Sequence, residues 1–110
     1  MEELMLTKPT RLFCQEWRTS DKATLWDFFP SQMQVRMCMD ERLPNPIVEV
    51  EVSQGQDMPD SYWAWWDIAG QRWTMVFPNK KLVEICFPYG SKAEEDRGRG
   101  KLLPVKIFRL

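Results

Sequence analysis

Four tryptophans lie within the segment SYWAWWDIAGQRWTMVFP, and they are the side chains of this chain best suited to binding. They are Trp63, Trp65, Trp66 and Trp73. A buried indole contributes about 150–250 Å² of contact, and tryptophan is enriched among the residues that dominate protein interfaces. An indole also offers a flat face on which a nucleic-acid base can stack. The segment therefore predicts either a core or a surface that binds a macromolecule.

The remaining side chains offer little to an enzyme. The sequence contains no histidine, which removes the commonest general base and the Ser-His and Cys-His nucleophile pairs. The five glycines are dispersed, and RGRG lacks the strand-to-helix setting of a phosphate-binding loop. Glu49 and Glu51 could share a hard cation, but their two-residue spacing is what any solvated strand face produces. We therefore expect a non-enzymatic protein without a cofactor or a metal.

Basic side chains gather towards the end of the chain, although the net charge is only −1. The last fourteen residues contain no acid and carry Arg97, Arg99, Lys101, Lys106 and Arg109. Together with Lys80 and Lys81, these residues could meet an anionic partner. The acidic run EED directly before Arg97 favours the simpler interpretation, a solvated loop followed by a strand.

Length and cysteine usage favour a single globular domain over residues 1–110. The chain is 44% hydrophobic and 28% charged, which is enough apolar surface for a core. Cys14, Cys38 and Cys86 have neither metal-site nor redox-pair spacing, so we expect free thiols in a reducing compartment. No apolar run approaches the roughly 20 residues that span a bilayer, and the acidic start does not resemble a secretory signal. We expect a cytoplasmic protein that does not bind membranes.

The elements that must position these residues are predicted from hydrophobic spacing. In TSDKATLWDFFP, Ser20 suits a helix N-terminus and Pro30 suits its end, so we predict one short helix near 20–29. In SQMQVRMCMDE, apolar residues alternate from Met33 to Met39, which predicts a half-buried strand. The run IVEVEV alternates in the same way and predicts another strand.

The tryptophan segment itself predicts a hairpin that turns at Ala69-Gly70. In that register the facing pairs are Asp67–Arg72, Trp66–Trp73, Ala64–Met75 and Tyr62–Phe77. The first is an opposite-charge pair and the second an aromatic pair, and both kinds stabilise a sheet. A second turn in PNKK would add a third strand, which gives a meander over 61–88.

Alternation along this meander separates the tryptophans. Trp66 and Trp73 fall on one strongly apolar face, which we assign to the core, whereas Trp63 and Trp65 fall on the other. That second face is too apolar to be simply solvated, so other strands cover it or part of it stays open for a partner. A covered position is favoured slightly for Trp65, and the two alternatives are even for Trp63.

These elements predict an α+β domain, with a mostly antiparallel sheet of five to six strands and one short helix. A small β-barrel or a sandwich is the alternative. The run LLPVKIFRL predicts a final strand, and Pro104 cannot donate to a ladder. That strand is therefore expected at a sheet edge or with a bulge.

The function that fits best is a small protein–protein interaction module or inhibitor that docks through surface aromatics. The predicted contact residues are Trp63, Trp65, Lys80, Lys81, Arg97, Arg99 and Lys101. The alternative is a small β domain that binds single-stranded nucleic acid by tryptophan stacking and basic residues, although such domains are usually strongly basic. A homodimer packed through its aromatics is a third hypothesis. No motif resembles a known family. Only the general character of the chain, a small aromatic-rich domain without histidine, resembles that of small virus-encoded proteins that block host machinery.

Overall fold

The computed structural model describes residues 6–42, 45–87 and 91–110. Its strands are β1 (Thr10–Arg18), β2 (Ala23–Phe29), β3 (Ile47–Gln54), β4 (Tyr62–Asp67), β5 (Arg72–Phe77) and β6 (Gly100–Arg109). Its helices are α1 (Gln32–Cys38), α2 (Lys80–Cys86) and α3 (Ser91–Asp96). None of these short helices is long enough to cross a membrane.

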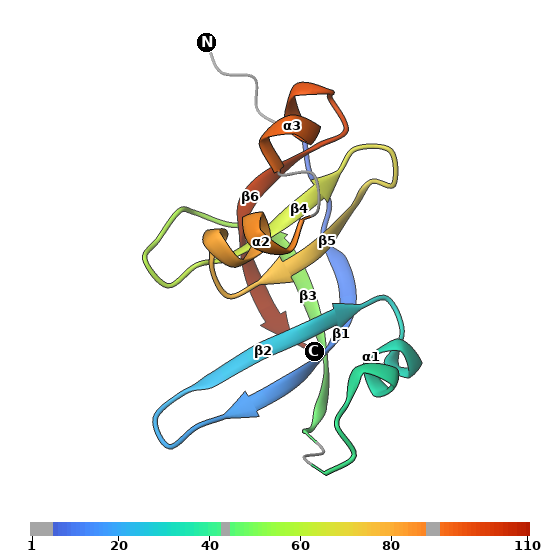
Figure 1. The fold of residues 1–110 in the computed structure, drawn as a ribbon, viewed down its shortest axis with the longest axis vertical. Coiled ribbons are helices and arrows are strands. Elements are labelled where there is room, and N and C mark those ends of the chain that lie inside the picture. Colours follow the sequence, from blue (N-terminus) through green and yellow to red (C-terminus); the bar gives the residue numbers. More distant parts are fainter. Residues whose placement is uncertain (1–5, 43–44, 88–90) are drawn as a thin grey trace.

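All six strands belong to one antiparallel sheet in the order β2-β1-β3-β6-β4-β5. The sheet is strongly curled, so that its two edge strands, β2 and β5, come into contact (Figure 1). The result is nearly a barrel, and it confirms the predicted α+β domain and its barrel-like alternative. None of the backbone ladders within the described ranges joins β2 to β5. We call the line along which these two edges face each other, between residues 27–30 and 72–77, the seam.

The interior of the curled sheet holds the larger of two apolar cores. It consists of Leu12, Cys14, Leu25, Val50, Val52, Ala64, Trp66, Trp73, Val76 and Val105. The Trp66 and Trp73 rings meet edge-on at its centre, with 5.0 Å between their centroids. Both indoles are therefore core, as predicted. A smaller core of Trp65, Val83 and Leu102 lies on the other face of β4 and β6, where α2 covers the sheet (Figure 1).

The predicted hairpin of β4 and β5 is correct next to its turn and wrong further from it. Asp67 pairs with Arg72 and Trp66 with Trp73, as expected. Beyond them a bulge at Met75, whose φ is +51°, shifts the register by one residue. The predicted pairs Ala64–Met75 and Tyr62–Phe77 are therefore wrong, since Trp63 takes the place opposite Phe77.

The helix predicted near 20–29 is wrong, because most of that segment is β2, which pairs with β1 along its length. The strand predicted over Met33–Met39 is also wrong, since α1 occupies it. The Ser31 side chain accepts a hydrogen bond from the Gln34 backbone N–H and caps this helix. Only Val35 of α1 is buried, so the alternating methionines are not the buried face of a strand.

The third strand of the predicted 61–88 meander is also absent from the part of that range that the structure describes, which ends at residue 87. Its place in the chain is taken by α2, which begins after Asn79, whose side chain accepts a hydrogen bond from the Leu82 N–H. The neighbour of β4 on its other side is instead β6.

Pro104 lies in this inner strand and not at a sheet edge. Its carbonyl oxygen accepts a hydrogen bond from Gly55 N–H, directly after β3 ends. A residue in an antiparallel strand points its N and its C=O to the same side, so the ring nitrogen of Pro104 also faces the end of β3. The missing N–H therefore spares the ladder with β4 and falls where the ladder between β3 and β6 ends. The edge position predicted for this strand is wrong.

Candidate functional site

The two tryptophans predicted to contact a partner pack largely against α2 and the segment after it. Trp65 is only 5% exposed and lies 5.1 Å, centroid to centroid, from the Phe87 ring. Trp63 is half-buried on the same face, and the Lys80 ammonium sits 5.0 Å from its ring centroid in a cation–π contact. These indoles are therefore mainly part of the smaller core.

The predicted basic residues are split between the two ends of β4. Lys80 and Lys81 begin α2, near Trp63. Arg97, Arg99 and Lys101 lie at the other end, where the Arg99 carbonyl accepts a hydrogen bond from Ile68 N–H. Both arginines are also paired with the buried carboxylate of Glu94, at 3.0 and 3.3 Å. The structure therefore does not bring the seven predicted residues together in one site.

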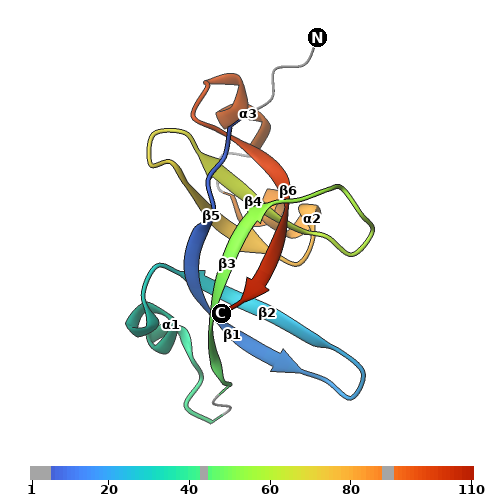
Figure 2. The same cartoon turned by 180° about the vertical axis from the view of Figure 1, so that it is seen from behind.

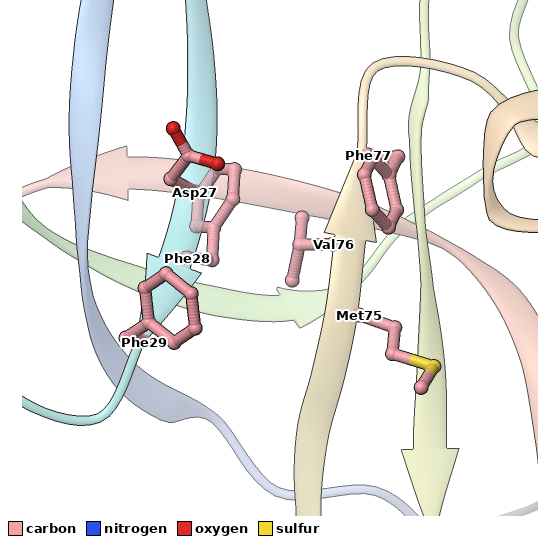
Figure 3. Close-up of a pocket in the computed structure, with 6 residues that line it drawn as sticks. All are labelled: Asp27, Phe28, Phe29, Met75, Val76 and Phe77. Atoms are coloured by element: carbon pink, nitrogen blue, oxygen red, sulfur yellow. The ribbon is translucent and has the colours of Figure 1, made fainter. Parts of the chain in front are cut away.

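The seam is the more prominent feature, and the sequence reasoning missed it. Two cavities of about 200 and 210 Å³ lie between its edges. The residues that line them are Leu12, Asp27, Phe28, Phe29, Pro30, Arg72, Trp73, Thr74, Met75, Val76 and Phe77. Side chains from β2 and β5 stand on either side of the gap, with Phe28 and Val76 pointing toward one another (Figure 3). The cavities share Phe28, Phe29 and Met75, so they form one apolar slot.

Side chains, and not a ladder, satisfy one backbone N–H of each edge strand, in or next to this slot. The Leu25 N–H on β2 donates to the Tyr62 hydroxyl at 2.8 Å. The Trp73 N–H on β5 donates to the Thr10 hydroxyl at 2.9 Å, because the start of β1 runs beside β5 before the strand crosses to β2 (Figure 2). Each hydroxyl stands where a neighbouring strand would otherwise place a carbonyl oxygen.

Bulges on both edges keep the seam from closing into a regular ladder. Asp27 on β2 and Met75 on β5 have φ of +58° and +51°, in the left-handed region that side chains disfavour. Each accompanies a register shift against the inner neighbouring strand, and both residues line the same cavity. Such bulges break the regular spacing of an edge, which is consistent with the missing ladder between β2 and β5. No glycine marks these positions, so the sequence carried no signal for them.

Two ionisable side chains, those of Glu16 and Cys14, are buried in or next to the core. Glu16 is buried, and the hydrogen bond from Arg18, together with Arg109, holds the pKa of its carboxyl below the usual value. Burial raises the pKa of the Cys14 thiol to about 12, so this thiol stays protonated at neutral pH and is a poor nucleophile. No group of three or more Cys, Asp and Glu side chains that could hold a metal ion occurs in the described part of the chain.

The seam thus combines unladdered strand edges with an apolar slot, an arrangement suited to binding an extended chain. Comparisons of this sequence and structure with protein-family models, with curated proteins and with solved structures found no match.

Proposed function

We propose that the protein is a non-enzymatic binding module that holds an extended segment of a partner protein in the seam. One observation carries this proposal: β2 and β5 face each other without a ladder, and apolar cavities separate them. Backbone N–H and C=O groups of an edge strand can pair with an added strand, while neighbouring pockets select its side chains. Action as an inhibitor and a cytoplasmic location are further parts of the proposal, which identification of the partner would test.

A protein partner fits the slot better than a single-stranded nucleic acid. The slot is lined mainly by apolar and aromatic side chains, with Arg72 its one basic member among the residues described there. A nucleic-acid groove needs cations along its length for the phosphates. The five basic residues predicted as contacts lie instead at the two ends of β4, and two of them are already paired with Glu94.

Selection from a random-peptide display library tests the proposal, with Met75→Asn as the counter-selected variant. Met75 lines both cavities and is 39% exposed. Asparagine tolerates left-handed backbone better than methionine does, so this variant removes the apolar side chain and keeps the bulge. Met58→Asn is the matched control, since Met58 is 53% exposed in the loop after β3 and lines neither cavity.

We expect selected peptides to bind the wild type and Met58→Asn equally and to bind Met75→Asn about tenfold more weakly. Binding should change little between about 50 and 200 mM salt, whereas a nucleic-acid ligand would lose affinity steeply over that range. Peptides that bind Met75→Asn as well as the wild type would contradict the proposal. A seam filled by a second copy would instead appear as a dimer in light scattering.

A further inference from the structure

A third cavity, of about 250 Å³, adjoins the seam and is lined by Trp17, Trp26 and Asp27. In the ladder of β1 and β2, Trp17 pairs with Thr24 and Gln15 pairs with Trp26. Paired residues share a sheet face, so the two indoles are diagonal neighbours on one face, within reach of a common ligand. Asp27 lines both this cavity and the seam, so the two spaces lie on either side of the same residue.

The Asp27 carboxylate is hydrogen-bonded to a buried amide, that of Gln15. Its Oδ2 accepts a hydrogen bond from Gln15 Nε2 at 2.6 Å, and Gln15 is only 1% exposed. Gln15 Oε1 in turn accepts a hydrogen bond from Asn45 Nδ2 at 3.4 Å. The left-handed φ of Asp27 adds backbone strain to this arrangement. The hydrogen bond from Gln15 thus orients the carboxylate.

No cationic partner of this carboxylate is found in the part of the chain that the structure describes. None of the ion pairs among residues 6–42, 45–87 and 91–110 includes Asp27. Burial raises the pKa of its carboxyl above the ordinary value, and the hydrogen bond from Gln15 only partly opposes that effect. A partly buried negative charge outside the described ion pairs, in a pocket lined by two electron-rich indoles, is a site that favours a cation.

We propose that this pocket binds a guanidinium group, the head of an arginine side chain on the partner. Guanidinium is planar and weakly hydrated, so it stacks on indole faces, and its N–H groups match carboxylate oxygens. A metal ion is disfavoured because the pocket supplies a single carboxylate. That the guanidinium belongs to a protein partner rests on the proposed function. Binding of a small guanidinium compound to the pocket does not.

Titration followed by indole N–H NMR signals tests the site, with N-acetyl-arginine methylamide as the probe. The six tryptophans of the chain give six such signals. We expect the signals of Trp17 and Trp26 to shift. The signal of Trp65, which is buried against Phe87 in the smaller core, should stay unchanged as an internal control. The citrulline analogue, which has the same shape without the charge, should cause no shift.

The variant Asp27→Asn keeps the shape and the tolerance for left-handed backbone, and it should weaken binding of the probe at least about fivefold. Equal shifts from the arginine and citrulline probes, or full binding to Asp27→Asn, would overturn the inference. Tighter binding of choline than of the arginine probe would also overturn it, since the site would then select a quaternary ammonium.

The outcomes separate this inference from the proposed function. If the arginine probe does not bind while the selected peptides still depend on Met75, only the guanidinium site is refuted. Binding of the arginine probe without any seam-dependent peptide would refute the proposed function and leave the cation site standing. If both hold, the selected peptides should carry an arginine at a fixed position, and its replacement by citrulline should weaken binding about as much as Asp27→Asn does.

Discussion

Replacing Tyr62 with phenylalanine tests whether the edge of β2 is free of a backbone ladder to β5. The Tyr62 hydroxyl accepts the hydrogen bond from Leu25 N–H at 2.8 Å, and its ring packs edge-on against Phe28 with centroids 6.3 Å apart. Phenylalanine keeps the ring and its packing, so the change removes the hydroxyl alone. Leu25 is buried, and the variant therefore leaves its N–H without an acceptor.

The expected cost follows from that single unsatisfied donor. A buried N–H that loses its partner lowers the free energy of unfolding by about 1–3 kcal/mol. For a domain of this size each kcal/mol lowers the Tm by about 4–8 °C. Urea unfolding measures the global change, and amide hydrogen exchange measures the local one. The Leu25 amide should exchange faster than global destabilisation alone explains, while the Trp73 amide should follow the global change only.

Thr10→Val is the reciprocal control, because it removes the acceptor of the Trp73 N–H and keeps the shape of the side chain. In that variant the Trp73 amide should lose protection and the Leu25 amide should not. If Tyr62→Phe changes the free energy of unfolding by less than about 0.5 kcal/mol and leaves Leu25 protected, the Leu25 N–H must be bonded elsewhere. The obvious alternative acceptor is the β5 backbone, and our description of the seam would then be incorrect.

Three further predictions concern packing, charge and thiol reactivity. Gly100→Ala should destabilise the fold by about 1–3 kcal/mol in urea unfolding. The added Cβ would lie 2.5 Å from the Trp65 ring and collide with a backbone carbonyl. An unchanged urea midpoint would contradict this packing. Asp27→Asn should unfold at higher urea than the wild type at pH 7, since the raised pKa means that ionised Asp27 costs stability in the folded state. This advantage should disappear as the pH falls through the folded pKa to below the ordinary 3.8, and a pH-independent difference would refute it. Folded protein at pH 8 should react with a thiol reagent at its two exposed cysteines and not at Cys14, whose thiol is buried and has a pKa of about 12; reaction of all three thiols before unfolding would contradict this.

The parts of the fold that depend on local pattern could be predicted from the sequence. Alternation and a turn dipeptide were enough to place the Trp66–Trp73 pair in the core and to set the register beside the turn. The apolar second face slightly favoured a covered Trp65, and α2 covers it.

The parts that depend on distant partners could not be predicted. The segment 23–29 carries helix-like caps around it, but pairing with β1 makes it a strand. The next segment alternates like a strand, yet it follows Pro30 and has a capping Ser31, and it forms a single short helix. Short segments of this kind fit both the helical and the strand period of apolar residues, and tertiary contacts decide between the two.

The candidate site was missed for the same reason. Its two edges are about 45 residues apart in the chain, and the bulges that shape it are at Asp27 and Met75, neither of them glycine. Aromatic richness correctly indicated large apolar contacts, but it drew attention to Trp63 and Trp65, which are packed near α2. The most prominent aromatic segment of a small domain is often its core, and the sequence alone did not separate the two.

The central claim, that β2 and β5 form an open seam able to take up a strand, is tested most directly by scalar couplings through backbone hydrogen bonds. In the free protein we predict no such coupling between residues of β2 and β5. With a display-selected peptide bound, we predict new couplings between that peptide and one or both of these strands. A ladder of couplings joining β2 to β5 in the free protein, or a bound peptide coupled to neither strand, would contradict the account.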